Sequence, residues 1–415
     1  MMVCSKKIRI AFFVTSFRGG GAEKVFQQII NALAKRKYFD LFVFTIENEF
    51  DYKLSPNIFL KCFTNGHSRD NKLVKLKNSL IAFYKLYKHL RYIKPDVVIS
   101  GATNRANIIA LAVKVFTKDG YKSIICEHTN LREYYKNKSF IESSIMLFLI
   151  PLLYSHVDKI VTVSKGLALD LVQQYHIKAK KIEVIYNPIN INEIVRKRSE
   201  EIEPVFKKIF EYPVIINVGR LSRQKGQWHL IRAFRLVKEK LPETKLVFLG
   251  KGPLEVYLRK LAEEFGLKKD VYFLGFHKNP FKFIARAKVF VLSSLWESFG
   301  NVILESLACN TPVIATDCDF GPREILSTKS YKNRVWDKIE YENYGILVPP
   351  LEGKFYTSDE PLSRGEKLLA ESIINLLSNK KVYSFYKEAC KKAIKNFSFE
   401  KAIENYIEVI KNSLL

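Results

Sequence analysis

Short apolar segments alternate along the chain with longer segments in which apolar residues recur every three or four positions. In the first half the short segments span residues 7–15, 40–47, 96–100 and 123–126. Segments of this length and composition are typical of strands buried on both faces of a parallel sheet, and the longer segments are typical of amphipathic helices. The first half therefore predicts a doubly wound α/β domain.

The alternation is interrupted once, near the middle of the chain. Residues 191–212 are highly charged, and we expect them to form a linker. Beyond them the pattern restarts, with predicted strands at 213–218, 245–249 and 271–274, each followed by a loop and a helical segment. The two halves together predict two doubly wound parallel sheets, each with its own core.

The segment 296–315 carries two carboxylates beside a predicted strand. An apolar strand at 287–293 precedes it, and a helix is expected over 301–308. Glu297 thus falls in the loop after the strand, and Glu305 falls inside the helix. In open parallel sheets ligands bind outside the carboxyl ends of strands, so both acids are candidates for a binding site. Two solvated acids on a capped surface helix are the alternative.

The wider pattern resembles the retaining glycosyltransferases of family four, which have the GT-B fold. The two acids are spaced as Glu-x7-Glu, Phe-Gly follows the first, Ala-Cys precedes Thr-Pro-Val-Ile-Ala, and Gly-Pro-Arg-Glu-Ile begins at Gly321. The most similar members are bacterial enzymes that build cell-surface or lipid-linked glycans. The resemblance implies two Rossmann-like domains that face a central cleft. It places the acceptor side in 1–190, the nucleotide-sugar site in 213–396, and the helix 397–415 back on the first domain.

Two loops of the chain suit a phosphate group. Residues 19–21 are glycines between a predicted strand and a helix, where backbone amides can face an anion, although a tight turn that needs glycine fits equally well. The pattern is not G-x-G-x-x-G, so a nicotinamide cofactor is not favoured. Arg220 and Lys225 lie in the loop after another strand, and two cations there suit a diphosphate leaving group. The P-loop pattern is absent, which argues against an NTPase.

The resemblance implies a role for each of these positions. Arg220 and Lys225 would bind the donor diphosphate and stabilise the charge that builds as the glycosidic bond breaks. Glu305 would accept hydrogen bonds from the ribose hydroxyls. Glu297 and His128, the histidine after the strand at 123–126, would position the transferred sugar and act electrostatically. The residues that would complete the donor site are Gly20, Gly21, Gly219, Phe276, Phe299, Gly300 and Asn301.

The resembled family retains the configuration of the transferred sugar. Retention can proceed through a carboxylate nucleophile, as in glycosidases with two acids. In the family picture the departing phosphate instead helps to deprotonate the acceptor hydroxyl on the same face of the sugar, and no protein nucleophile is required. Ser298 and Asn310 stand where glycine is frequent in the family. Neither difference removes a side chain that would bind the donor. Ser298 would change the shape of the sugar pocket, so the identity of the donor sugar stays open.

The triplet Asp317-Cys318-Asp319 spells D-x-D, a metal-binding motif of a different glycosyltransferase fold. Here it follows a strand of the second half and precedes Gly321-Pro322, inside the pattern of a metal-independent fold. We therefore expect no metal and no other cofactor, with the nucleotide sugar serving as a substrate.

The composition indicates the charge of the protein surface and the compartment in which the protein works. The 415 residues carry a formal net charge of +26, concentrated in the first half, which favours acidic partners. The cysteines are scattered without a C-x-x-C pair, and no secretory signal precedes the first strand, so we expect a reduced, cytoplasmic compartment. The longest apolar run, 145–154, is too short to span a bilayer and is expected to be a buried helix.

A predicted helix over 72–94 interleaves apolar residues with lysines. Packing of the apolar stripe on the sheet, with the lysines solvated, is the simpler interpretation. The alternative is a basic amphipathic surface that meets an anionic membrane, which would suit an enzyme with a lipid-linked acceptor.

These observations favour a retaining hexosyltransferase that moves a hexose or N-acetylhexosamine from a UDP- or GDP-sugar to a glycan acceptor during synthesis of cell-envelope glycans, lipopolysaccharide or glycoprotein oligosaccharides. The expected acceptor is linked to undecaprenyl diphosphate, and the expected location is the cytoplasm or the inner face of the cell membrane. A nucleotide-sugar epimerase or a phosphorylase on the same fold is the alternative. Nucleic-acid binding has only the positive charge in its favour, because no motif for it is recognisable.

Overall fold

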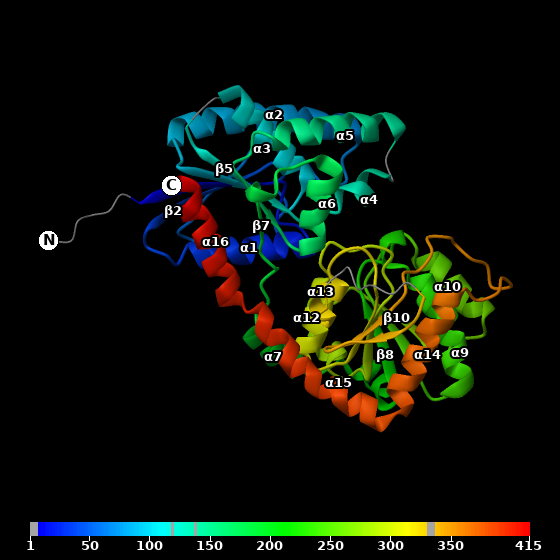
Figure 1. The fold of residues 1–415 in the computed structure, drawn as a ribbon. Coiled ribbons are helices and arrows are strands. Elements are labelled where there is room, and N and C mark those ends of the chain that lie inside the picture. Colours follow the sequence, from blue (N-terminus) through cyan, green and yellow to red (C-terminus); the bar gives the residue numbers. More distant parts are fainter. Residues whose placement is uncertain (1–6, 118–119, 137–138, 330–336) are drawn as a thin grey trace. The chain divides into compact units, whose positions relative to one another are not determined.

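The computed structural model describes the chain except for residues 1–6, 118–119, 137–138 and 330–336. The chain divides into two compact units, the first made of residues 1–188 and 400–415 and the second of residues 189–399. Each unit contains one seven-stranded sheet with helices packed on both of its faces (Figure 1).

The first sheet is parallel throughout, and its strands have the order β3-β2-β1-β4-β5-β6-β7. These strands are β1 (Ile8–Val14), β2 (Phe39–Thr45), β3 (Phe59–Cys62), β4 (Val97–Ser100), β5 (Lys122–Glu127), β6 (Lys159–Thr162) and β7 (Ile182–Val184). The helices of this unit are α1 (Gly21–Leu33), α2 (Lys72–Ile93), α3 (Asn104–Thr117), α4 (Leu131–Lys136), α5 (Phe140–Tyr154), α6 (Lys165–Tyr175) and α16 (Phe399–Leu414).

The second sheet has the order β10-β9-β8-β11-β12-β14-β13 and is parallel except for the β13–β14 pair. Its strands are β8 (Val214–Val218), β9 (Lys245–Leu249), β10 (Val271–Gly275), β11 (Val289–Leu292), β12 (Val313–Thr316), β13 (Glu340–Tyr341) and β14 (Ile346–Val348). Its helices are α7 (Ile191–Arg198), α8 (Pro204–Lys207), α9 (Gln227–Lys240), α10 (Glu255–Glu264), α11 (Phe281–Ile284), α12 (Asn301–Ala308), α13 (Pro322–Leu326), α14 (Arg364–Ser378) and α15 (Lys380–Ala393).

Both sheets are therefore doubly wound, and each has one point at which the direction of strand addition reverses. In the first sheet this point lies between β1 and β4, and in the second it lies between β8 and β11. The loops that leave two such strands run to opposite sides, and ligands of doubly wound proteins bind at that place. Gly20 and Gly21 follow β1, Arg220 and Lys225 follow β8, and Glu297 follows β11.

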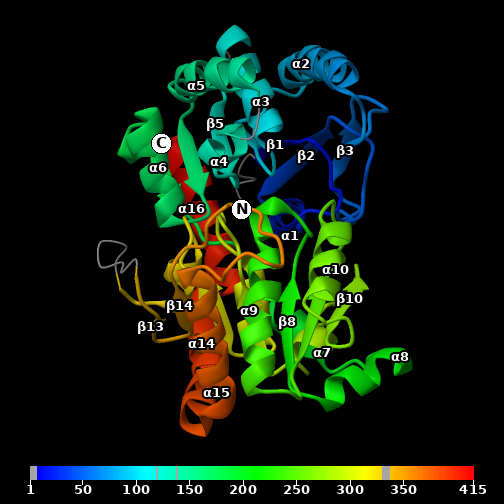
Figure 2. The ribbon, with the colours of Figure 1, turned by 90° about the vertical axis from the view of Figure 1, so that its right-hand side faces the viewer.

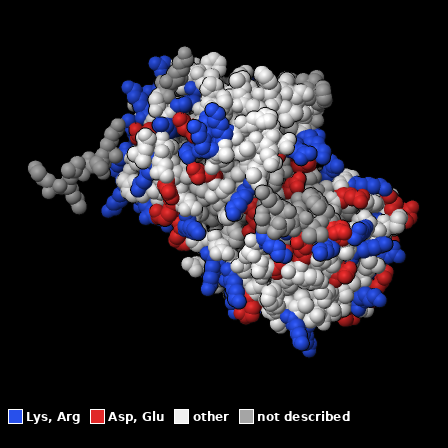
Figure 3. Space-filling view, in the orientation of Figure 1, with Lys and Arg blue, Asp and Glu red and all other residues white. Residues whose placement is uncertain are grey.

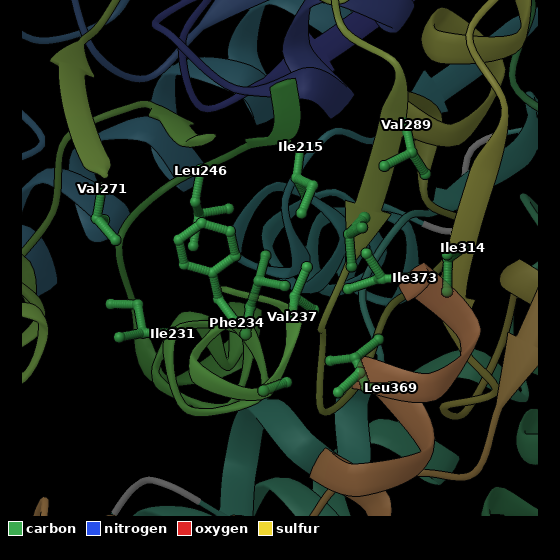
Figure 4. Close-up of a cluster of buried hydrophobic side chains, with 14 of the residues drawn as sticks. Ile215, Ile231, Phe234, Val237, Leu246, Val271, Val289, Ile314, Leu369 and Ile373 are labelled. Atoms are coloured by element: carbon green, nitrogen blue, oxygen red, sulfur yellow. The ribbon is translucent and has the colours of Figure 1, made fainter. Parts of the chain in front are cut away.

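The core of the second unit shows why the periodic segments form helices. Ile231, Phe234 and Val237 recur on one face of α9 and are completely buried, where they pack with Ile215 of β8 and Leu246 of β9 (Figure 4). Burial of each such side chain contributes about 1.5–3 kcal/mol. Helix α14 lies beside α9 and covers the same core (Figure 2).

Helix α5 differs from the expectation of a buried helix. Ile150, Leu153 and Tyr154 are buried in one core with Ile125 of β5 and Ile160 of β6. Ile145, Leu147, Phe148 and Leu152 are exposed, because α5 lies in the outer layer and only part of its surface packs on the unit. Figure 3 shows that the surface over α5 is mostly free of charged side chains. Among the described residues, no helix is both long and apolar enough to cross a bilayer.

Helix α2 packs on the sheet over only part of its length. Ala82, Leu86 and Leu90 are buried against the core of the first unit. The leucines near the start of the helix belong to the predicted apolar stripe, but they remain exposed to solvent. They are Leu73, Leu76 and Leu80.

The segments around the unit boundary also have defined structure. Residues 191–212, which we expected to link the two sheets, form α7, α8 and a 3₁₀ turn and belong to the second unit. Most of α16 belongs to the first unit. There Glu404 pairs with Arg36, the Lys411 ammonium lies over the Tyr38 ring, and Tyr406 is hydrogen-bonded to Cys126.

Candidate active site

The loops after β8 and β11 meet at the switch point of the second sheet. The backbone N–H of Leu295 donates to the carbonyl of Gln224 at 2.8 Å, and the Gln224 side-chain amide donates to the carbonyl of Trp296 at 3.1 Å. The Ser293 hydroxyl donates to the carbonyl of Lys225 at 2.9 Å. These bonds hold the turn that carries Lys225 against the loop that carries Glu297.

Gly226 allows this close approach. Its φ of +56° lies in the left-handed region, and a Cβ atom there would lie 2.3 Å from the carbonyl oxygen of Ser293. Any other residue at this position would push the two loops apart.

Lys225 and Glu297 form an ion pair at this point. Lys225 Nζ lies 2.5 Å from Glu297 Oε1, and the Ser294 hydroxyl donates to the same oxygen at 2.7 Å. Glu297 is only 5% exposed, so the carboxylate depends on these two partners for its stability. The structure thus joins two residues that the sequence placed in separate loops.

Arg220 and Gly219 lie next to this pair. The Arg220 side chain is exposed and forms no ion pair with another described residue, so its charge is available to an anionic ligand. A Cβ atom on Gly219 would lie 3.4 Å from Lys225 Cε, which shows that the lysine stem passes directly over the glycine backbone.

The turn before α12 presents the N-terminus of that helix. Gly300 adopts φ +90° and caps α12, which begins at Asn301. Phe299 is buried beside the Phe397 ring, and a Cβ atom on Gly321 would lie 1.9 Å from the Phe299 carbonyl oxygen. The first amides of α12 therefore have a fixed direction and favour a negatively charged group.

The two remaining donor-site residues of this unit lie further along the same elements. Glu305 is partly buried in the second turn of α12. Phe276 follows Gly275 at the end of β10, an edge strand two positions away from β8, and its side chain is 66% exposed. Gly275 has φ +78°, and its carbonyl accepts a hydrogen bond from Gly250 N–H at 2.8 Å, which fixes the backbone before Phe276.

In the first unit, Gly20 caps α1 and Gly21 begins it. A Cβ atom on Gly20 would lie 1.7 Å from Glu23 Oε2, so the Glu23 carboxylate folds over the glycine at the start of the helix. Burial raises the pKa of Glu23 to about 6, although a hydrogen bond from its own backbone N–H lowers it. The helix terminus that we expected to face a phosphate thus already carries an acidic side chain, and Glu23 is not among the predicted site residues.

His128 follows β5 and lies against α1. Its ring meets the Phe26 ring edge-on with 6.3 Å between the centroids. Both ring nitrogens are buried and have no hydrogen-bond partner among the described residues. Burial lowers the pKa of His128 to about 4, so the ring is neutral at pH 7 and can offer one donor and one acceptor to a ligand.

Glu127, next to His128, is a buried carboxylate that sequence reasoning missed. It accepts hydrogen bonds from the Tyr154 hydroxyl at 2.7 Å and from Thr129 N–H at 3.0 Å. Burial raises the pKa of Glu127 to about 7, although these hydrogen bonds lower it. The available signal was an acidic residue at the end of the apolar strand that also delivers the histidine.

The first acid of the D-x-D triplet is committed to a structural ion pair. Asp317 is buried and accepts two hydrogen bonds from Arg323, at 3.0 Å from Nε and at 2.8 Å from Nη2. Arg323 also pairs with Glu340. Within the described part of the chain, no three histidine, cysteine or acidic side chains gather in a way that would hold a metal ion.

Two family models match the chain in succession. The model described as Glycosyltransferase Family 4 covers residues 19–193, and the model described as Glycosyl transferases group 1 covers residues 199–338. These ranges contain every predicted site residue.

Similar proteins extend over most of the chain. An uncharacterized glycosyltransferase of Methanocaldococcus jannaschii is 34% identical over 80% of this chain and 83% of its own length. An N-acetylgalactosamine-N,N'-diacetylbacillosaminyl-diphospho-undecaprenol 4-alpha-N-acetylgalactosaminyltransferase of Campylobacter jejuni is also 34% identical, over 78% and 84% of the two chains. Another Campylobacter jejuni enzyme, an alpha-1,4-N-acetyl-D-galactosaminyltransferase acting on a diphospho-undecaprenol glycan, is 27% identical over 82% and 84%.

Solved structures share the fold at low identity. Anabaena HepE in complex with UDP and glucose has a TM-score of 0.72 and 19% identity, with 98% of this chain and 100% of that chain covered. WaaG, a glycosyltransferase of lipopolysaccharide biosynthesis, has a TM-score of 0.69 and 16% identity, with 97% and 99% covered. The architecture of two parallel-sheet units is that of the GT-B glycosyltransferases.

Proposed function

We infer that this chain, which belongs to the glycosyltransferases of family 4 and group 1, moves a hexose or N-acetylhexosamine from a UDP- or GDP-linked donor to a glycan acceptor. The observation that carries the proposal is the Lys225–Glu297 ion pair at the switch point of the second sheet. It places a cation and a carboxylate beside the N-terminus of α12 and beside Arg220, which forms no ion pair with another described residue.

Each of these groups has a task in the proposed reaction. Arg220, Lys225 and the amides of α12 would bind the diphosphate and stabilise the charge of the leaving group. Glu297 would exchange its lysine partner for hydroxyls of the transferred sugar, and Glu305 would bind the ribose. The backbone at Phe276 would contact the base.

In the first unit, the neutral His128 would contribute hydrogen bonds to the donor sugar. We propose retention of configuration, with the leaving phosphate assisting deprotonation of the acceptor, and without a metal ion. The commitment of Asp317 to Arg323 supports this assignment for the D-x-D triplet, because its first carboxylate already has a cationic partner.

The acceptor that we propose is a glycan linked to undecaprenyl diphosphate. The named acceptors of the two Campylobacter jejuni relatives are the support for this part of the proposal. Such an acceptor lies in a membrane, so the enzyme would have to bind the membrane surface. Helix α2 suits an anionic surface because it carries six basic residues and no acidic one. The exposed apolar residues of α2 and α5 would enter the lipid interface beside this charge.

The test is binding of nucleotide diphosphates and their sugars by calorimetry, followed by a transfer assay. We expect one nucleotide to bind, and Lys225→Ala and Glu305→Ala to weaken it about 10–100-fold. Lys260→Ala, on the exposed face of α10, is the matched control. Transfer should persist in a chelator. Failure to bind any nucleotide diphosphate would refute the proposal, and conversion of the free donor to an epimer without an acceptor would favour an epimerase.

A further inference from the structure

The Glu127 carboxylate receives hydrogen bonds from two directions. On the side of the loop after β5, it accepts the backbone N–H groups of His128 and Thr129, the latter at 3.0 Å. On the side of the helices, it accepts the Tyr154 hydroxyl of α5 at 2.7 Å and the Asn107 amide of α3 at 3.5 Å. The carboxylate thus ties the turn that carries His128 to two helices of the first unit.

The helical side of this arrangement is held firmly. Asn107 is completely buried, its Oδ1 accepts the Ser100 hydroxyl at 2.9 Å, and its Nδ2 also donates to the Cys126 carbonyl at 3.3 Å. Tyr154 is completely buried as well. Because a buried network with satisfied hydrogen bonds is rigid, the Glu127 carboxylate has a fixed position relative to β4 and β5.

Packing alone does not explain a carboxylate at this position. Glu127 is 1% exposed, and no lysine or arginine of the described chain pairs with it. Burial raises the pKa of Glu127 to about 7, so its negative charge costs stability near neutral pH. Its partners all donate hydrogen bonds, and a carboxylate can accept them at both of its oxygens. A buried acid that costs stability beside a candidate site residue indicates a function.

The His128 ring has no polar partner that would orient it. Both ring nitrogens lack a hydrogen-bond partner among the described residues, and the edge-on contact with Phe26 is apolar. The direction of the ring therefore follows from the backbone of the turn, which Glu127 holds. A misplacement of about 1 Å can lower the rate of an enzyme about 10²-fold, so this turn has to be held closely for His128 to meet a substrate.

We propose that Glu127 positions His128 for the donor sugar by holding the backbone N–H groups of the turn, and that Glu127 transfers no proton to or from the substrate. The proposal rests on the contact between His128 and the donor sugar in the proposed function. It concerns the geometry of the turn, which can also be measured in the free protein.

A double-mutant cycle on kcat/KM for the donor is the first test. Glu127→Ala should lower kcat/KM up to about 10²-fold, and nucleotide diphosphate binding by the second unit should be unchanged. In a His128→Ala background, Glu127→Ala should lower kcat/KM by no more than about twofold, because the ring that Glu127 positions is already gone.

Two conservative variants separate the length of the side chain from its charge. Glu127→Gln should retain most of the transfer, because its carbonyl oxygen can still accept the two N–H groups of the turn. Glu127→Asp keeps the charge but is shorter by one methylene group, so it should lose transfer. If Glu127→Ala does not fold, Glu127→Asp takes its place in the cycle.

Asp158→Ala is the matched control. Asp158 accepts the backbone N–H and the hydroxyl of Ser123 at the opposite end of β5, both at 2.8 Å. Any loss of activity in Asp158→Ala should be the same with and without His128, within about twofold.

NMR of the histidine rings in the free protein is the second test, and it needs no substrate. The His128 signal, identified by its absence in His128→Ala, should shift in Glu127→Ala and Glu127→Asp. It should stay close to that of wild type in Glu127→Gln and Asp158→Ala.

Three outcomes would overturn the proposal. Equal losses of transfer in Glu127→Gln and Glu127→Ala would show that the carboxylate itself moves a proton. Additive losses in Glu127→Ala and His128→Ala would show that Glu127 only supports the fold, and an unchanged His128 signal in Glu127→Ala would show that it does not hold the turn. If wild type transfers no sugar, the proposed function fails, whereas the NMR comparison still decides whether Glu127 positions the ring.

Discussion

At the scale of single residues, the candidate site depends on charges that already have partners. Lys225 and Glu297 neutralise each other, and the Glu23 carboxylate lies at the start of α1. The proposed nucleotide-sugar donor would therefore compete with side chains of the protein for its binding groups. This competition determines how the affinity responds to substitution.

Glu297→Gln should separate nucleotide binding from sugar transfer. Without the carboxylate, Lys225 is free for the diphosphate, so we expect the bare nucleoside diphosphate to bind severalfold more tightly. Transfer should fall about 10²–10³-fold, because a charged group that positions the reacting sugar is lost. Calorimetry and initial rates provide the two measurements. Glu255→Gln, in the exposed pair with Arg259, is the control, and weaker nucleotide binding by Glu297→Gln would contradict this view.

Glu127 should make stability depend on pH. Its folded-state pKa of about 7 lies above the ordinary value of 4.5, so the folded chain holds a proton that the unfolded chain releases between these values. Stability from this group is present below pH 4.5 and is lost as the pH rises toward 7. Glu127→Gln should therefore gain about 3 kcal/mol relative to wild type between pH 4.5 and 8. Urea unfolding at several pH values measures this difference. The same pH dependence of the free energy of unfolding in wild type and Glu127→Gln would disprove the prediction.

At the scale of elements, a buried ion pair joins α9 to α14. Glu366 accepts hydrogen bonds from His229 Nδ1 and Arg232 Nε, both at 2.8 Å, and it closes the capping box with Ser363 at the start of α14. Arg232 is completely buried and also donates to three backbone carbonyls of the segment before α14. One carboxylate thus holds two helices and a loop in register.

Glu366→Ala should be strongly destabilising. It leaves the Arg232 guanidinium without its buried counter-charge and removes the Glu366 half of the capping box of α14, and together these changes cost about 3–5 kcal/mol. Urea unfolding followed by circular dichroism measures the loss. The exposed pair on α10 supplies the control, because Glu255→Ala should change stability by less than about 1 kcal/mol. A similar small change for Glu366→Ala would show that the network contributes little.

The sequence predicts the elements well, but it predicts the faces that they bury less well. Periodicity in α2 and α5 identifies which residues share a side of the helix, whereas the neighbour that covers that side is set by the strand order. Leu76 and Phe148 are exposed for this reason, although their patterns suit a core. In the same way, the motifs select Lys225 and Glu297, but the adjacency of β8 and β11 is what brings the two residues together.

At the scale of the whole molecule, the net charge of +26 and the exposed apolar residues of α2 and α5 would both contribute to binding the proposed partner, an anionic membrane. Attraction between exposed charges is screened by salt over about 8–10 Å, whereas insertion of apolar side chains is not. The two contributions can therefore be separated by ionic strength.

Binding to anionic vesicles should fall with salt to a residual level that the apolar residues maintain. Leu76→Glu combined with Leu80→Glu should abolish this salt-resistant fraction, because both leucines would have to enter the lipid interface. Val256→Glu, at a still more exposed apolar position on α10, should leave it unchanged. Sedimentation of vesicles at low and high salt provides the measurement. Loss of binding in the α10 variant alone would mean that another surface meets the lipid.

The position of α16 has a consequence for how the protein is made. The helix completes the first unit through Tyr406, Glu404 and Lys411, yet the ribosome synthesises it only after the roughly two hundred residues of 189–399. At about 5–20 residues per second, that delay lasts about 10–40 s. During this interval the nascent first unit keeps the surface around Cys126 and Tyr38 uncovered. A chaperone that shields nascent apolar surface would therefore have its longest opportunity on the half of the chain that is translated first.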